Sequence, residues 1–179
     1  MAVIYAKMVV FGTVSILYSI MNEIRNYLRE ITKRLQAGGQ TEMSYRTDFQ
    51  VLLRQLLPKE IAITEEAQGT NNIGRPDFTF TCAGRPIGYI ETKDIGDRDL
   101  EGYQLKGGNK EQFDRYKSSL QNIIFTDYLR FLYYRDGELV MEVSIATLTA
   151  DRKAKPIELN FGQFQEMIKA FAEHQGVPI

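Results

Sequence analysis

The sequence contains no tryptophan, one cysteine and one histidine among its 179 residues. Because Cys82 has no second cysteine with which to pair, an internal disulfide and a cysteine-rich zinc site are both excluded. With His174 as the single histidine, neither a histidine-based catalytic dyad nor a histidine metal cluster is expected. Any chemistry is therefore expected to depend on carboxylates and lysine, in a reducing compartment such as the cytoplasm.

An excess of charge of either sign is also missing, since 22 Lys and Arg residues stand against 23 Asp and Glu residues. A basic footprint over the whole chain, which is typical of many nucleic-acid-binding proteins, is therefore absent, although a local basic patch remains compatible with these numbers. The length predicts one domain with an appended helix or arm. The hydrophobic content of 44% is that of an ordinary folded protein.

The longest apolar run covers residues 8–21, which is shorter than the ~20 residues that a membrane-spanning helix needs. A signal peptide or membrane anchor is one interpretation of this segment. The favoured interpretation is a buried strand or the start of a helix, and we expect no membrane partner. The segment leads into residues 19–35, where apolar side chains recur at helical spacing. Two glycines follow and are expected to end this helix.

The rest of the chain predicts an α/β fold with a mixed central sheet flanked by helices and an extra N-terminal helix. We divide it into an N-terminal apolar segment and helix over residues 1–40, a core over 41–150, and a linker with a C-terminal helix over 151–179. The predicted elements are helices over 42–57, 110–120 and 161–173; strands over 61–67, 77–82, 87–93, 122–126, 129–135 and 138–145; a loop over 94–109; and a linker over 151–155.

The predicted hairpin of residues 77–93 is the most informative part of the sequence. If its turn centres on Gly84, Asp77 lies directly opposite Glu91, and Lys93 points to the same face of the sheet. Opposed carboxylates repel each other, and a divalent cation between them removes that repulsion. Oxygen ligands without sulfur or imidazole favour Mg²⁺ or Mn²⁺ over zinc. An isolated Glu-x-Lys indicates only a surface salt bridge, but the preceding Pro-Asp and the apolar flanks favour a site.

These residues resemble the motif of the PD-(D/E)XK nuclease superfamily, with Arg75-Pro76-Asp77 followed by Glu91-Thr92-Lys93. The resemblance implies a restriction-endonuclease-like core that hydrolyses DNA phosphodiester bonds with Mg²⁺, for which Mn²⁺ substitutes. It also implies that Asp77 and Glu91 are metal ligands and that Lys93 is the catalytic lysine.

Two further features of the superfamily have counterparts here. Many members add an acidic metal ligand from the first core helix, for which Glu42 is the best match and Asp48 a weaker one. Several subfamilies carry Gln-x-x-x-Tyr on the helix after the catalytic strand, which matches Gln112 and Tyr116 and would add both to the catalytic set. Their spacing places the two side chains on one helix face. An ordinary amphipathic helix is the alternative interpretation of that pair.

A narrower resemblance is to the N-terminal nuclease region of single-chain restriction-modification enzymes, in which the nuclease is fused to an adenine-specific DNA methyltransferase. It is carried by residues 42–46, 74–77, 89–94 and 124–128. It implies DNA as substrate and a partner methyltransferase or helicase, as a domain or subunit absent from this chain. A homodimer is a further expectation, because cleavage of both strands usually needs two active sites.

Other functions remain open at this stage. A nuclease acting on branched DNA or RNA fits the same residues, and so does a catalytically inactive DNA-binding or assembly module that keeps the nuclease fold. Basic side chains beside the predicted site either contact DNA phosphates or form a solvated face. They are Lys106, Lys110, Arg115 and Lys117.

Overall fold

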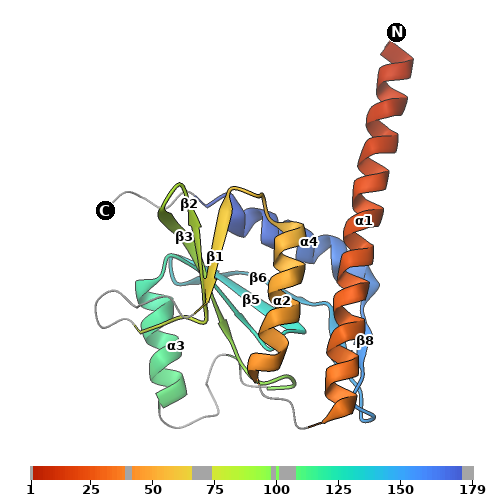
Figure 1. Ribbon diagram of the computed structural model, residues 1–179. Helices are drawn as coiled ribbons and strands as arrows, with labels where there is room; N and C mark the ends of the chain where they lie inside the picture. Colours follow the sequence, from red (N-terminus) through yellow and green to blue (C-terminus); the bar gives the residue numbers. More distant parts are fainter. Residues whose placement is uncertain (1, 39–41, 66–73, 98–99, 101–107, 175–179) are drawn as a thin grey trace.

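The computed structural model describes the chain except residues 1, 39–41, 66–73, 98–99, 101–107 and 175–179 (Figure 1). It has four α-helices, one short 3-10 helix and eight strands among the described residues. In chain order these are α1 (Ala2–Ala37), α2 (Glu42–Leu56), β1 (Ile61–Glu65), β2 (Phe78–Cys82), β3 (Arg85–Thr92), α3 (Gly108–Ser119), β4 (Asn122–Thr126), β5 (Arg130–Arg135), β6 (Glu138–Ser144), β7 (Ala146–Leu148), β8 (Ala154–Pro156), η1 (Glu158–Asn160) and α4 (Phe161–Ala172).

The main sheet is mixed, as the sequence predicts, and its six strands follow the order β1-β2-β3-β4-β5-β6. Strands β3 and β4 are parallel, whereas every other neighbouring pair is antiparallel. A parallel pair needs a crossover connection, and α3 lies within the segment that joins β3 to β4. The result is an α/β fold that is compatible with the restriction-endonuclease-like core expected from the sequence.

The β2–β3 hairpin has the predicted register. Its pairs near the candidate site are Phe78 with Ile90, Thr79 with Tyr89, and Phe80 with Gly88. One further step in this register places Asp77 opposite Glu91. A bulge after Phe80 shifts the pairing closer to the turn. The turn itself consists of Ala83 and Gly84, both with positive φ, which is typical of a two-residue hairpin turn.

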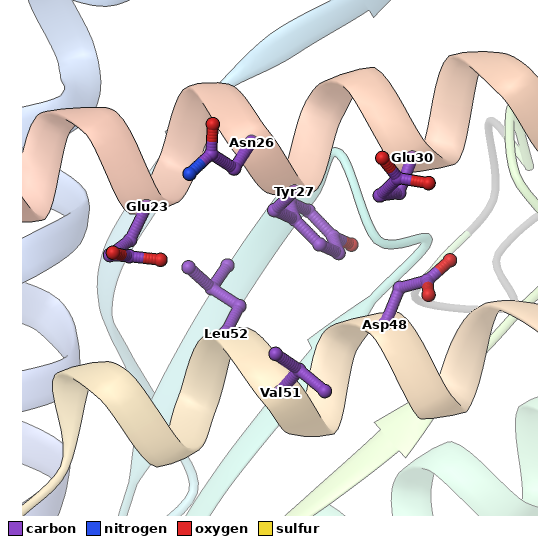
Figure 2. A pocket seen from close by; sticks show the side chains of 7 residues that line it. All are labelled: Glu23, Asn26, Tyr27, Glu30, Asp48, Val51 and Leu52. Carbon is purple, nitrogen blue, oxygen red and sulfur yellow. The ribbon is translucent and has the colours of Figure 1, made fainter.

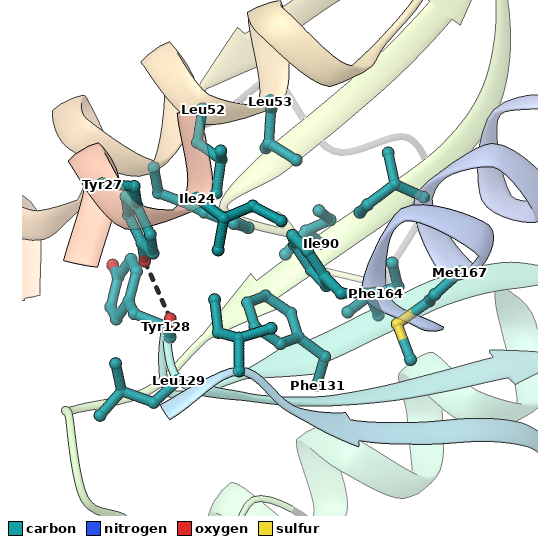
Figure 3. Packing of buried hydrophobic residues seen from close by; sticks show 14 of the residues in the cluster. Ile24, Tyr27, Leu52, Leu53, Ile90, Tyr128, Leu129, Phe131, Phe164 and Met167 are labelled. Carbon is teal, nitrogen blue, oxygen red and sulfur yellow. Dashed lines mark hydrogen bonds between the residues drawn. The ribbon is translucent and has the colours of Figure 1, made fainter. Parts of the chain in front are cut away.

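One face of the sheet is covered by α1, α2 and α4, which together enclose the larger hydrophobic core (Figures 1 and 3). Phe49 of α2 lies at its centre, with ring centroids of Tyr27, Phe78, Tyr128 and Phe131 within 6.1 Å of its own. The Tyr27 hydroxyl donates a hydrogen bond of 2.9 Å to the Tyr128 carbonyl, which satisfies both buried polar groups.

The opposite face packs against α3, where Phe113 and Tyr116 contribute to a second, smaller core. Successive side chains of β4 point to opposite faces of the sheet and so contribute to different cores. Ile123 and Phe125 pack on the α3 side, and Ile124 packs in the larger core. The same alternation in β3 places Ile90 in the larger core. Tyr89 packs against the core on the α3 side, so Glu91, two residues further along β3, faces α3 as well.

Of the two interpretations of residues 8–21, the helix is confirmed and the strand is wrong, and the predicted linker over 151–155 is partly wrong. Residues 8–21 do not begin with a strand, because the whole segment belongs to the continuous helix α1, whose first turns project beyond the rest of the molecule in Figure 1. Residues 154 and 155 of the predicted linker belong to β8, which pairs with β7. A hydrogen bond of 3.0 Å from the Ala154 amide to the Thr32 hydroxyl holds β8 to α1. Most of the predicted loop 94–109 lies outside the described residues. No helix within the described residues is long and apolar enough to cross a membrane.

Candidate active site

The candidate site lies between the sheet and α3, where β2 begins and β3 ends. Asp77 immediately precedes β2, Glu91 lies in β3, and Lys93 follows the last residue of that strand. Because Ile90 points into the larger core, its neighbour Glu91 points to the α3 side. Asp77, in contrast, lies at the start of β2 in contact with Arg46 of α2 and with Thr92. The structure therefore brings the two carboxylates and the ammonium together at one end of the hairpin.

Glu91 is the most deeply buried charged group of the site, with 6% of its side chain exposed. Its Oε1 accepts a hydrogen bond of 2.9 Å from Lys93 Nζ. Its Oε2 is buried and has no hydrogen-bond partner. Burial raises the pKa of Glu91 to about 7, with Lys93 opposing that rise and the Asp77 carboxylate adding to it. A buried oxygen without a partner is uncommon and indicates a place where a ligand is expected.

Asp77 is held by two residues that sequence reasoning missed. Its Oδ2 accepts hydrogen bonds of 2.7 Å from both the backbone amide and the hydroxyl of Thr92. Its Oδ1 accepts one of 2.5 Å from the guanidinium of Arg46 in α2. The Arg46 side chain is only 9% exposed and that of Asp77 13%. Nothing in the local pattern around Arg46 could have identified it, because its partner lies 31 residues away in the sequence.

The ammonium of Lys93 is linked to α3 through a chain of hydrogen bonds. Lys93 Nζ donates to Gln112 Oε1 at 3.3 Å, and Gln112 Nε2 donates to the Tyr116 hydroxyl at 3.4 Å. The four-residue spacing puts both α3 side chains on one helix face, as predicted. Burial raises the pKa of the Tyr116 hydroxyl, which therefore stays protonated at neutral pH.

Gly74 brings the segment before Asp77 against the same tyrosine. Its φ of +113° is a conformation that other residues rarely adopt. A Cβ at this position would lie 2.8 Å from the Tyr116 hydroxyl. Glycine therefore allows the chain that leads into Asp77 to pack directly on α3, which couples the two halves of the site.

Of the two additional acidic candidates, only Asp48 can be placed, and it does not lie at the site. Glu42 is the first residue of α2, but its side chain lies outside the described part of the structure. Asp48 forms an ion pair with Arg34 and lines a pocket between α1 and α2 (Figure 2). The pocket is lined by Glu23, Asn26, Tyr27, Glu30, Asp48, Val51 and Leu52. In the part of the chain that the structure describes, no three His, Cys, Asp or Glu side chains gather to hold a metal.

The basic side chains near α3 have local partners. Lys110 forms an exposed ion pair with Asp114, Arg115 lies over the Tyr116 ring, and Lys117 lies over the ring of Tyr134. Lys106 lies outside the described residues. Lys110 and Arg115 are exposed, and contacts of this kind are weak at an exposed surface.

Comparisons with known proteins support the fold. No protein-family profile and no curated protein matches the sequence. Among solved structures, one chain of a cryo-EM structure of a DrdV–DNA complex matches with a TM-score of 0.63 and 23% sequence identity. The match covers 87% of this chain but only 14% of the DrdV chain. This chain therefore has the fold of a small part of a much larger protein.

Proposed function

We propose that this chain is a Mg²⁺-dependent endonuclease domain of the PD-(D/E)XK type that hydrolyses DNA phosphodiester bonds as part of a restriction-modification system. The observation that carries the proposal is the state of the buried Glu91 carboxylate. One of its oxygens binds Lys93, and the other has no partner. Asp77 is close enough to raise the pKa of Glu91.

The donor set fits a hard divalent cation. Mg²⁺ is usually held by one or two carboxylates together with substrate phosphates and water, so two acids from the protein are sufficient. Asp77 and Glu91 would hold the ion, Glu42 is a further candidate ligand, and Mn²⁺ would replace Mg²⁺. A bound ion would supply a Lewis acid for the scissile phosphate.

Lys93 would supply a fixed positive charge beside the reacting phosphate. Its ammonium is held from one side by Glu91 and from the other by Gln112, which in turn binds Tyr116. An ammonium held in this way offsets the negative charge that grows on the phosphate in the transition state and orients the attacking water. Gln112 and Tyr116 act as positioning residues for that ammonium.

DNA is the proposed substrate. The fold matches a chain of a DNA-bound structure, of which it covers only 14%. That share supports the expectation that sequence recognition, and a methyltransferase or helicase activity, belong to domains or subunits other than this chain. Exposed Lys110 and Arg115 on α3 provide cationic groups for phosphates beside the site.

One observation favours a second candidate function, a catalytically inactive DNA-binding or assembly module. Both oxygens of Asp77 already accept hydrogen bonds, from Arg46 and from Thr92. In such a module the hydrogen bonds of Asp77 with Arg46 and Thr92 would serve only to hold the β2–β3 hairpin against α2. This module would bind neither Mg²⁺ nor Mn²⁺ at millimolar concentration.

The test compares nicking of supercoiled plasmid by the wild type, Asp77→Asn and Lys93→Met. Asparagine is chosen over alanine because it keeps an oxygen that can accept a hydrogen bond from the buried Arg46 guanidinium, whereas Asp77→Ala would remove the acceptor together with the charge. We expect each variant to lose ~100-fold or more of the Mg²⁺-dependent rate.

Asp114→Asn is the matched control, because Asp114 is an exposed carboxylate on α3, and we expect it to nick at the wild-type rate. Nicking at that rate by both site variants would overturn the proposal. A folded wild type that neither cleaves DNA nor binds either ion in calorimetry would establish the inactive module instead.

A further inference from the structure

Two carboxylates and two cationic side chains of the described residues meet at the candidate site. The carboxylates are Asp77 and Glu91, and the cations are Arg46 and Lys93. Each carboxylate pairs with one cation, at 2.5 Å for Asp77 and 2.9 Å for Glu91. A carboxylate that already has a cationic partner attracts a divalent cation less than a bare carboxylate would.

We propose that Arg46 is a built-in counter-ion that competes with the divalent cation for Asp77. This inference rests on the cation site of the proposed function. The Arg46 side chain is 9% exposed, so solvent screens its charge poorly. Arg46 therefore repels a divalent ion bound at Asp77 and Glu91 at short range. The ion must also displace the hydrogen bond from Arg46 to Asp77 Oδ1 before it can bind that oxygen.

Thr92 makes this competition possible without loss of the site. Its amide and hydroxyl both bind Oδ2, whereas Arg46 binds Oδ1. The Asp77 carboxylate therefore remains in place when the bond from Arg46 is given up. An anionic phosphodiester beside the site offsets the positive charge that the bound ion adds. Arg46 thus makes ion binding weak in the free protein and couples it to substrate.

The opposite role for Arg46 predicts the opposite result. If Arg46 served only to position Asp77 for the ion, as hydrogen-bonded partners of ligating carboxylates commonly do, its removal would weaken ion binding. If Arg46 competes with the ion, removal of its charge strengthens ion binding.

The experiment measures Mn²⁺ affinity by calorimetry without DNA. Arg46→Gln keeps an N–H donor for Asp77 but removes the charge, and we expect it to bind Mn²⁺ about tenfold more tightly than the wild type. Arg46→Lys keeps the charge and should stay close to the wild-type affinity. Arg34→Gln is the matched control, because it removes the same charge from an arginine–aspartate pair at Asp48. Equal or weaker binding by Arg46→Gln would overturn the inference.

A second measurement needs no variant. In the wild type, a Mg²⁺ titration followed by NMR of the arginine side chains should shift the Arg46 Nε–H signal and leave that of Arg34 unchanged. An unperturbed Arg46 signal at saturating ion would overturn the inference.

Asp77→Asn separates this inference from the proposed function. If the wild type does not bind Mn²⁺, or if Asp77→Asn binds it equally well, the proposed cation site itself is wrong. If the wild type binds, Asp77→Asn does not, and Arg46→Gln binds no more tightly, only the competition by Arg46 is wrong.

Discussion

Replacement of Glu91 by glutamine tests the electrostatic state of the site without DNA or metal. The carboxylate is buried beside Asp77, and its pKa rises from 4.5 to about 7 in the folded protein. The folded state therefore holds the Glu91 proton more tightly than the unfolded state does. Ionisation of Glu91 destabilises the fold, so the stability due to this group is complete below pH 4.5 and is lost as the pH rises to about 7.

The pKa shift sets the magnitude of the effect. A rise from 4.5 to about 7 corresponds to about 3 kcal/mol of unfolding free energy, lost at up to ~1.4 kcal/mol per pH unit between these values. Glutamine has nearly the same shape, keeps an oxygen that can accept from Lys93, and does not titrate. The stability of Glu91→Gln relative to the wild type should therefore increase by about 3 kcal/mol between pH 4 and pH 8.

Urea unfolding of both proteins in EDTA, at several pH values across this range, measures the difference directly. Other titrating groups are common to both proteins, so they cancel in the comparison. Glu142→Gln serves as the control, because the Glu142 side chain is 48% exposed, and its curve should stay parallel to that of the wild type. Parallel curves for Glu91→Gln as well would refute the argument that burial keeps this carboxylate protonated.

Other perturbations give equally direct outcomes. In the wild type at pH 8, Mn²⁺ at ~100 times its dissociation constant should raise the unfolding free energy by about 2.7 kcal/mol. EDTA should reverse this gain, and an equal gain in Glu91→Gln would contradict the cation site. Gly88→Ala would place a Cβ 2.5 Å from the Phe171 ring and should cost about 1–3 kcal/mol in urea unfolding. Gly162→Ala, which meets no atom within 4 Å, should cost nothing, and similar losses for both alanines would refute the packing argument.

The features that the sequence predicted well depend on residues close together along the chain. The β2–β3 register follows from the alternation of apolar residues on both sides of a two-residue turn, so the placement of Asp77 opposite Glu91 needed no distant contact. The shared helix face of Gln112 and Tyr116 likewise follows from their spacing alone.

The features that could not be predicted from the sequence depend on contacts between residues far apart in the chain. Residues 151–155 carry a charged, linker-like pattern, yet Ala154 is buried in β8 because it packs beside α1, more than a hundred residues earlier. The apolar residues 8–21 fit a strand start as well as a helix, and the helix that follows them extends through the segment. Short-range patterns do not distinguish these alternatives.

The sequence by itself determined the sheet class, the hairpin register and the meeting of Asp77, Glu91 and Lys93 at one end of the hairpin, because the periods of strands and helices are local properties of the chain. The tertiary structure alone decided how those groups are charged and bonded. It buried Glu91 with one unpartnered oxygen and brought Arg46 from α2 onto Asp77. Burial and long-range pairing, which depend on how the layers pack, set the electrostatics of the site.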